Sequence, residues 1–417
     1  MSDSQKPHHI LIIGGGIIGC TSAYYITHHP SFTSPSNSYS LTLLESSTIA
    51  AGASSKAGGL IAKWAYPSRL AKESYEEHKR LAGLYGGGER WGWRGVRCGE
   101  WGGRGRVEGE MGVDGGESIR KEFKKGVSGA RKGKKKFDTN GLDLDWIDEG
   151  LTDAYDPIGT EDDTAQVHPG EFTRSMIELA KQKGGENVRV VEGARVLGIV
   201  TIEEDGEDEE KVKGVRYVMN HEQGTELFME ADTIILTAGP WSPTILPSLP
   251  ITTSKAHSIV IHPTMPLPAH VLFTSITPSS SSSDNTKPVT SPELYPRPNN
   301  TLYACGPTSS PPLPLLASLV EPDKSAISAL HTAISSISTP IREGEVLIEQ
   351  ACFLPFVSDQ GGKRGIVEPF VKESGDGPLI GKVRGVDGLV VATGHAVWGI
   401  CNSTGTGRRV ARGVMGS

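Results

Sequence analysis

The feature that most constrains the fold is a glycine-rich turn between a short apolar run and a helix of small residues. The apolar run is His9–Ile13, the turn extends from Gly14 to Gly19, and a second apolar run ends at Glu45. The first run is short, rich in β-branched residues and without alternation, as a buried parallel strand should be. This order predicts a strand–helix–strand unit that opens a doubly wound sheet.

Each glycine of the turn has a physical role in such a unit. Gly14 permits the tight turn, Gly16 lets backbone N–H groups approach a pyrophosphate, and Gly19 lets the helix pack closely on the strand. The helix N-terminus adds partial positive charge, and Glu45 can accept hydrogen bonds from a ribose diol. The Pro/Ser-rich stretch Thr33–Ser38 accounts for the slightly long spacing between Gly19 and Glu45. The pattern predicts binding of an adenine dinucleotide.

Length and charge narrow the class of protein. A chain of 417 residues is too long for one ordinary core, so we expect two domains or one domain with large insertions. The net charge of −7 gives no argument for nucleic acid as a partner. The sequence lacks an apolar run of about 18 residues, and Met1–His8 is polar, so we expect neither a membrane span nor a cleaved signal peptide. We therefore expect a soluble, cytoplasmic protein.

The cysteines and histidines do not form a pattern typical of metal sites. The five cysteines lack CxxC spacing, which favours free, mostly buried thiols in a reducing compartment over a disulfide framework or a zinc site. The twelve histidines are scattered without ligand spacing. We predict no metal site.

The rest of the chain mixes two kinds of strand. Rossmann-type apolar strands recur near residue 235 and at 388–394, whereas the strands between them have antiparallel character. We therefore predict an α/β plus antiparallel β fold with a discontinuous nucleotide-binding domain and an inserted antiparallel-sheet substrate domain. The approximate boundaries are 1–85, 142–250 and 377–417 for the first domain, and mainly 251–376 with part of 142–170 for the second.

Residues 86–141 differ from both domains in composition. They are rich in glycine, arginine and lysine and contain few aliphatic side chains. Such a segment cannot bury enough apolar surface to offset its chain entropy, so we predict a largely mobile surface insert. It could contact a protein partner.

Taken together, the motifs resemble the D-amino-acid-oxidase-like family of FAD-dependent oxidoreductases, whose nucleotide-binding domain is of the glutathione-reductase-like Rossmann type. Besides the N-terminal turn, the matching segments are 52–60, 165–169 with 193–196, 238–242, and 377–381 with 392–399. Three further segments are similar to a fungal branch of oxidoreductases in that family: 255–259, 295–298 and 350–352.

The resemblance implies that FAD is the cofactor and gives the matching positions their roles. Toward the pyrophosphate, phosphates and adenosine it implies Ile17, Ile18, Glu45, Ser46, Ala53, Ser54 and Val196. The Ala238–Gly239 turn would close over the dinucleotide. Under and along the flavin it implies Gly58, Gly59, Leu60, Gly394, Val397, Gly399 and Ile400.

One position departs from the family pattern. Members that oxidise amino acids usually carry an arginine directly before the proline that corresponds to Pro355, and this arginine binds the substrate carboxylate. The residue here is Leu354, which cannot reproduce a bidentate grip. Either Arg297 takes this role from another strand, or the substrate lacks a free carboxylate.

Other candidates each have a functional and a structural interpretation. His395 could tune the flavin or orient an amine, or only hydrogen-bond backbone at a tight turn. Trp398 could cover the flavin or belong to the core, and Lys56 could promote reaction of reduced flavin with oxygen or be a solvated lysine. Strand alternation places His257 and Lys255 on one face, where they could meet the substrate.

These observations favour an FAD-dependent oxidoreductase that oxidises a C–N bond of an amine or amino-acid-like substrate. Hydride would pass to flavin N5, and oxygen or another acceptor would reoxidise the flavin. The alternative is a flavin-binding interaction or trafficking factor with little turnover, for which the resemblance leaves open a place at the periphery of an endomembrane. An NAD-dependent dehydrogenase is disfavoured, because the segment 394–399 returns to the cofactor as it does in flavoproteins.

Overall fold

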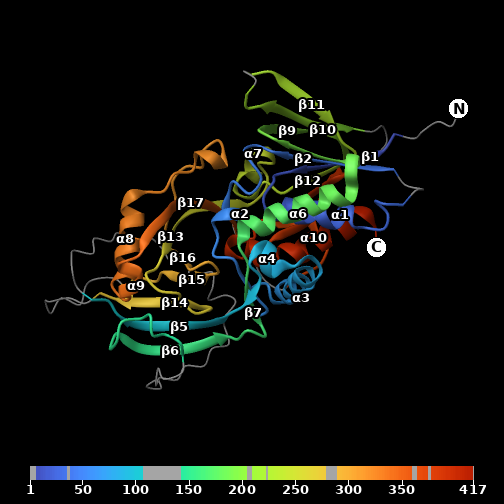
Figure 1. The fold of residues 1–417 in the computed structure, drawn as a ribbon. Coiled ribbons are helices and arrows are strands. Elements are labelled where there is room, and N and C mark those ends of the chain that lie inside the picture. The colour runs from blue at the N-terminus through green and yellow to red at the C-terminus, as the bar shows by residue number, and fades with distance from the viewer. Residues whose placement is uncertain are drawn as a thin grey trace.

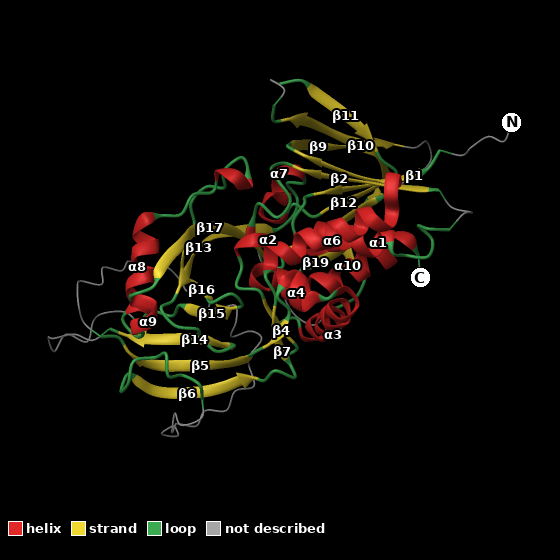
Figure 2. Ribbon diagram, in the orientation of Figure 1, coloured by secondary structure: helices red, strands yellow, loops and turns green. Residues whose placement is uncertain are grey.

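The computed structural model describes residues 6–34, 38–106, 142–203, 209–221, 224–278, 289–358, 364–373 and 377–416. Two large sheets dominate the described part of the chain (Figures 1 and 2). One is a mostly parallel sheet with helices on one face, and the other is a mostly antiparallel sheet beside it. The predicted fold class, α/β combined with antiparallel β, is confirmed.

The mostly parallel sheet is the core of the nucleotide-binding region. Its strand order is β18 (Val367–Pro369), β19 (Leu379–Val383), β21 (Leu389–Thr393), β12 (Thr233–Leu236), β1 (His8–Ile13), β2 (Tyr39–Glu45) and β8 (Val188–Glu192). The five strands from β21 to β8 are parallel to one another. At one edge, β19 pairs antiparallel with β21, and β18 pairs antiparallel with β19. Strand β12 pairs with β1, the first strand of the chain, and with β21, the last one. Both ends of the sequence therefore contribute to this sheet.

The two faces of this sheet are covered differently. Helices α1 (Ile17–Thr27), α6 (Pro169–Gly184) and α10 (Gly399–Met415) lie together on one face, with α3 (Ser68–Tyr85) packed on α10 (Figure 1). A small sheet covers the other face, where Leu11 and Ile13 meet Val212 and Val215. Its strands are β9 (Ala194–Glu203), β10 (Glu210–Met219), β11 (Glu226–Glu230) and β20 (Val386–Asp387).

The second large sheet is the predicted insert of antiparallel character. Its order is β17 (Glu345–Val357), β13 (Ile251–His262), β16 (Thr301–Ser309), β15 (Glu293–Arg297), β14 (His270–Thr277), β5 (Arg97–Arg104) and β6 (Thr152–Gly159). Helix α8 (Lys324–Ser335) packs on one face through Ile327 and Leu330, against Ile259 and Ile261 of β13. The other face, which carries Val260 and Tyr303, belongs to the main core that also contains Leu60 and Trp398.

Shorter elements connect these layers. A three-stranded sheet consists of β3 (Leu60–Ala62), β7 (Thr164–Gln166) and β4 (Arg94–Gly95). The described residues also form the α-helices α2 (Ala53–Lys56), α4 (Gly87–Trp91), α7 (Ser242–Ile245) and α9 (Thr339–Arg342). The 3-10 turns of the described residues include η1 (Gly185–Asn187), η2 (Gly239–Trp241), η3 (Ala317–Leu319) and η5 (Ala396–Trp398).

The predicted start of the mobile insert at residue 86 is wrong. Residues 87–104 form α4, β4 and β5, and β5 pairs in parallel with β14 and antiparallel with β6. The physical reason is that Trp91, Cys98 and Trp101 are buried, so a few large side chains supply the apolar surface that the glycine-rich composition conceals. The rest of the predicted insert, 107–141, lies outside the described residues. The domain boundaries otherwise stay a prediction.

All five cysteines are described, and all are free and buried, as predicted. Burial raises the pKa of each thiol, to about 11 for Cys352 and about 12 for Cys401. Among the described residues, no helix is long and apolar enough to cross a membrane.

Candidate functional site

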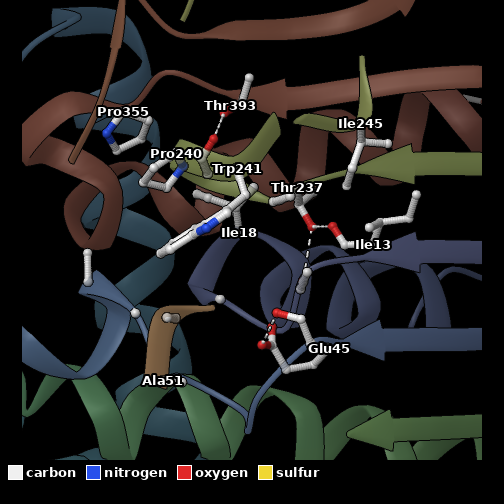
Figure 3. A pocket seen from close by; sticks show the side chains of 18 of the residues that line it. Ile13, Ile18, Glu45, Ala51, Thr237, Pro240, Trp241, Ile245, Pro355 and Thr393 are labelled. Atoms are coloured by element: carbon white, nitrogen blue, oxygen red, sulfur yellow. Dashed lines mark hydrogen bonds between the residues drawn. The ribbon is translucent and has the colours of Figure 1, made fainter. Parts of the chain in front are cut away.

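A cavity of about 470 Å³ opens at the carboxyl ends of the parallel strands, where ligands bind in open α/β sheets (Figure 3). Its walls come from the glycine turn, the end of β2, the α2 segment, β9, the segment 237–245 and the segment 392–399. Figure 3 shows Glu45 and Trp241 on these walls, and Thr237, whose hydroxyl donates to the backbone carbonyl of Ile13 at 2.9 Å.

The glycine turn is shaped by close backbone contacts. Gly14 has a φ of +108°, and a side chain there would meet the carbonyl oxygen of Thr237 at 2.6 Å. A Cβ at Gly19 would lie 2.0 Å from the carbonyl oxygen of Gly14, which is the close helix–strand packing expected of this position. A Cβ at Gly16 would meet only the Ser54 hydroxyl, at 3.1 Å, because this position faces the cavity.

The N-terminus of α1 offers hydrogen-bond donors to the cavity. Its N-cap is Gly16, which has no side chain of its own to cap the helix, and Ile17 and Ile18 line the cavity. The N–H of Ile17 donates to the Ser54 hydroxyl at 2.8 Å. Backbone donors and the positive end of the helix dipole form a site that suits an anion.

Glu45 is held rigidly at the end of β2. Its carboxylate accepts hydrogen bonds from the backbone N–H groups of Gly15 and Ser47, each at 2.7 Å, and from the Ser46 hydroxyl at 3.3 Å. Burial raises the pKa of Glu45, and these hydrogen bonds oppose that shift. A carboxylate fixed in this way, on the cavity wall, is suited to accept hydrogen bonds from a diol.

The structure brings most of the residues predicted for the cofactor to this one cavity. Those that line it are Gly14, Gly16, Ile17, Ile18, Glu45, Ser46, Ala53, Ser54, Val196, Ala238, Gly239 and Gly399. The other predicted cofactor residues do not line this cavity: Gly19, Gly58, Gly59, Leu60, Gly394, Val397 and Ile400. The individual contacts with the cofactor stay predictions.

One wall was not anticipated from the sequence. Leu313, Pro314, Leu315 and Ala317 line the cavity, although the Pro-rich composition of this segment indicates only a surface loop. The indole N–H of Trp241 donates to the carbonyl oxygen of Pro314 at 2.8 Å and holds the segment in place. The sequence carries no signal for this contact, because it joins two loops far apart in the chain.

The second sheet braces the loop Lys56–Gly58 beside the cavity. The Tyr303 hydroxyl donates to the carbonyl oxygen of Lys56 at 2.8 Å, and Arg297 Nη2 donates to that of Ala57 at 2.6 Å. A Cβ at Gly58 would lie 2.8 Å from the ring of Tyr295, so this ring covers the loop. The sheet therefore fixes the position of the segment that the resemblance places under the flavin.

Lys56 is not a solvated surface lysine. Its side chain is half-buried, and Nζ donates to the carbonyl oxygen of Ala351 in β17 at 3.0 Å. Burial lowers the pKa of this ammonium. The structure thus places a partly desolvated cation beside the second sheet, and its effect on the reaction with oxygen stays a prediction.

His395 lines the cavity and is uncharged at neutral pH. One ring nitrogen lies 3.0 Å from the Thr406 hydroxyl of α10, and burial lowers the pKa of His395 to about 3. Trp398 is buried and meets Trp64 edge-on, with ring centroids 5.9 Å apart. Trp398 is part of the main core and does not line the cavity, and its role beside the flavin stays a prediction.

His257 does not face the candidate site, so this prediction is wrong. His257 and Lys255 do share a face of β13, but it is the face toward α8, and both contact Asp323 there, at 3.0 and 2.6 Å. The opposite face carries Val260 and Tyr303. Alternation alone cannot say which face of a strand meets the cofactor, because both faces of this sheet are covered.

Leu354 and Arg297 both lie on the sheet face that meets the braced loop. Leu354 is two residues from Cys352, which lies near Lys56, and it is half-buried. Arg297 is buried, its guanidinium lies 4.7 Å from the centre of the Tyr303 ring, and burial lowers its pKa to about 10. Its contacts show that it braces the loop, and a role toward substrate stays a prediction.

Comparison with known proteins shows the family of this chain. The family model described as "FAD dependent oxidoreductase" matches residues 9–412. The chain belongs to this family of FAD-dependent oxidoreductases. It is an oxidoreductase, its cofactor is FAD, and the cradle of glycines, helix N-terminus and Glu45 fits that dinucleotide.

Two fungal relatives match over nearly the whole chain. The "Putative oxidoreductase C1F5.03c" of Schizosaccharomyces pombe is 31% identical and covers 100% of this chain and 95% of its own length. The "Putative oxidoreductase TDA3" of Saccharomyces cerevisiae is 26% identical, with 98% and 92% covered. The predicted resemblance to a fungal branch is therefore confirmed.

Solved structures share the fold at low sequence identity. A glycine oxidase from Geobacillus kaustophilus has a TM-score of 0.67 at 17% identity and covers 98% of this chain and 95% of its own. The L-proline dehydrogenase of P. horikoshii has a TM-score of 0.66 at 16% identity, with 97% and 92% covered. At such low sequence identity, these similarities show that the chains share a fold and nothing more.

Proposed function

We propose that this FAD-dependent oxidoreductase oxidises a carbon–nitrogen bond of an amine or amino-acid-like small molecule. When bound, FAD supplies the hydride acceptor, and oxygen or another acceptor reoxidises it. The chain contributes the dinucleotide cradle, the loop braced by the second sheet, and a wall that excludes water. A cytoplasmic location and a protein partner for the segment 86–141 also belong to this proposal.

The observation that carries this proposal is the chemical character of the sheet face that meets the loop Lys56–Gly58. This face is buried, yet it carries polar side chains where an ordinary core would be apolar. Its polar members are Ser258, Glu293, Tyr295, Arg297, Tyr303 and Cys305. A small polar substrate is the kind of ligand that such a wall can orient.

The first experiment is the visible spectrum of the purified protein, followed by anaerobic addition of glycine, D-alanine, L-proline and benzylamine. A flavin spectrum that one of these compounds bleaches is the expected result. A flavin that no amine or amino acid reduces would favour the alternative of a flavin-binding protein with little turnover. A protein that cannot be reconstituted with FAD at all would contradict the site described above.

Replacing Leu354 by arginine should raise activity on small amino acids. The introduced guanidinium would lie on the face that meets the loop, where a charge-assisted hydrogen bond to a carboxylate contributes about 1.5–3 kcal/mol. We therefore expect kcat/KM for glycine or D-alanine to rise by about 10- to 100-fold in Leu354→Arg. Steady-state kinetics with both amino acids measures this ratio.

The matched control is Ile348→Arg, which adds the same charge to an exposed position of the same strand. It should leave kcat/KM close to that of the wild type. If Leu354→Arg also leaves the ratio unchanged, position 354 does not face the substrate.

A further inference from the structure

Glu293 is a buried carboxylate without a basic partner among the described residues. It lies in β15 and is 5% exposed. Its Oε2 accepts hydrogen bonds from the Tyr295 hydroxyl at 2.6 Å and from the Cys305 thiol at 3.5 Å. An unpaired buried carboxylate is costly, so its presence in a sheet interior calls for a functional reason.

The side chain of Glu293 lies on the face that meets the braced loop. Glu293 pairs with Cys305, and Tyr295 pairs with Tyr303, whose hydroxyl binds Lys56. Residues paired directly across two strands point to the same face of the sheet. The ring of Tyr295 then connects Glu293 to Gly58 of the loop. Tyr295 thus lies between Glu293 and the segment expected under the flavin.

An amine substrate needs such a group. Near neutral pH most aliphatic amines in water are ammonium ions, because their pKa is about 10, as for a lysine side chain. An ammonium nitrogen has no lone pair to assist oxidation at the neighbouring carbon, so one proton must leave first. A buried carboxylate can both attract the ammonium ion and accept that proton.

We propose that Glu293 accepts the proton that the substrate ammonium loses before its carbon–nitrogen bond is oxidised, and that Tyr295 positions the carboxylate. This rests on the proposed function. In the step, one N–H bond of the ammonium breaks and one O–H bond forms on the carboxyl group. The electron pair of the broken bond stays on nitrogen, so nothing is oxidised or reduced.

The groups around Glu293 permit it to act near neutral pH. Burial raises the pKa of Glu293 to about 7, and the hydrogen bonds from Tyr295 and Cys305 oppose that shift. Burial also raises the pKa values of Tyr295, of Cys305 in β16 and of Cys98 in β5 well above their usual range. Arg297, two residues along β15, stays charged. Of these groups, only Glu293 changes its charge near pH 7.

The test is the pH dependence of flavin reduction in the FAD-loaded protein, followed anaerobically with glycine, D-alanine, L-proline and benzylamine. In the wild type, the second-order rate constant of reduction should rise with pH up to about 7 and then level off, because Glu293 must be ionised. In Glu293→Gln this rise should move to the pKa of the free amine, with a loss of about 100-fold at pH 7.5.

Tyr295→Phe separates positioning from proton transfer. Loss of its hydrogen bond removes a stabiliser of the carboxylate, so the rise in rate should shift to higher pH without disappearing. The matched control is Glu77→Gln, which alters another buried glutamate that accepts a hydrogen bond from a tyrosine, Tyr25, at 3.0 Å. Glu77 lies in α3, so its replacement should leave the pH profile unchanged.

An infrared titration without substrate gives a second readout. Between pH 6 and 8 the wild type should lose the carbonyl band of one buried protonated carboxyl group, and Glu293→Gln should lack that change. Reduction with the same pH profile in the wild type and Glu293→Gln would overturn the assignment of Glu293. Absence of reduction by all amines and amino acids would instead contradict the proposed function, and the assignment with it.

Discussion

Replacing Gly16 by valine should abolish FAD binding while leaving the protein folded. In the structure a Cβ at this position would meet only the Ser54 hydroxyl, at 3.1 Å, so a small shift of this one side chain admits it. The branched side chain would instead enter the cavity at the N-terminus of α1, where the pyrophosphate is expected. We expect affinity for FAD to fall at least about 100-fold, which corresponds to about 3 kcal/mol.

The measurement is titration of the apoprotein with FAD, followed by flavin fluorescence, together with the flavin content after purification. Gly83→Val is the matched control, because Gly83 lies in α3 with no atom within 4 Å of an added Cβ. It should purify with its full complement of flavin. A Gly16→Val protein that stays yellow would show that the dinucleotide does not use this turn.

Replacing Gly59 by alanine should give the largest loss of stability. Gly59 has a φ of +86°, which costs a side chain about 1–2 kcal/mol, and its Cβ would lie 2.0 Å from the carbonyl oxygen of Val167. The clash adds about 1–3 kcal/mol, because Val167 is buried and cannot withdraw easily. The same backbone pair is joined by the hydrogen bond from the Val167 N–H to the Gly59 carbonyl at 2.9 Å.

Thermal unfolding of apoprotein and FAD-loaded protein measures this effect. Gly150→Ala is the matched control, since Gly150 also has a positive φ, +76°, but no atom within 4 Å of an added Cβ. We expect Gly59→Ala to lower the melting temperature about twice as much as Gly150→Ala, or more. Equal losses would mean that the contact with Val167 relaxes at little cost.

The N-terminal unit was predictable because its constraints are local. Within one turn Gly14 adopts a positive φ and Gly19 packs on the carbonyl of Gly14, and Glu45 ends a strand that pairs directly with β1. The five buried thiols followed from spacing and composition.

Other parts of the site depend on contacts between distant segments. Position 257 was assigned to the substrate site from alternation, but the packing of α8 turned that face of β13 away from the loop. The ordered strand β5 was hidden by its glycine content, since its stability depends on pairing with β14 and β6 and on buried Trp101. The wall near Pro314 is joined to the segment 237–245 by a hydrogen bond from Trp241.

The sequence by itself determined the cofactor cradle, the fold class and the family. Glycine spacing and apolar strands are readable because they depend on backbone geometry within short segments. Only the tertiary structure decided which sheet face meets the loop Lys56–Gly58, and therefore that Glu293 and Tyr295 lie together behind it. The physical reason is that a strand pattern shows which residues share a face, whereas the layers packed on the sheet decide what each face meets.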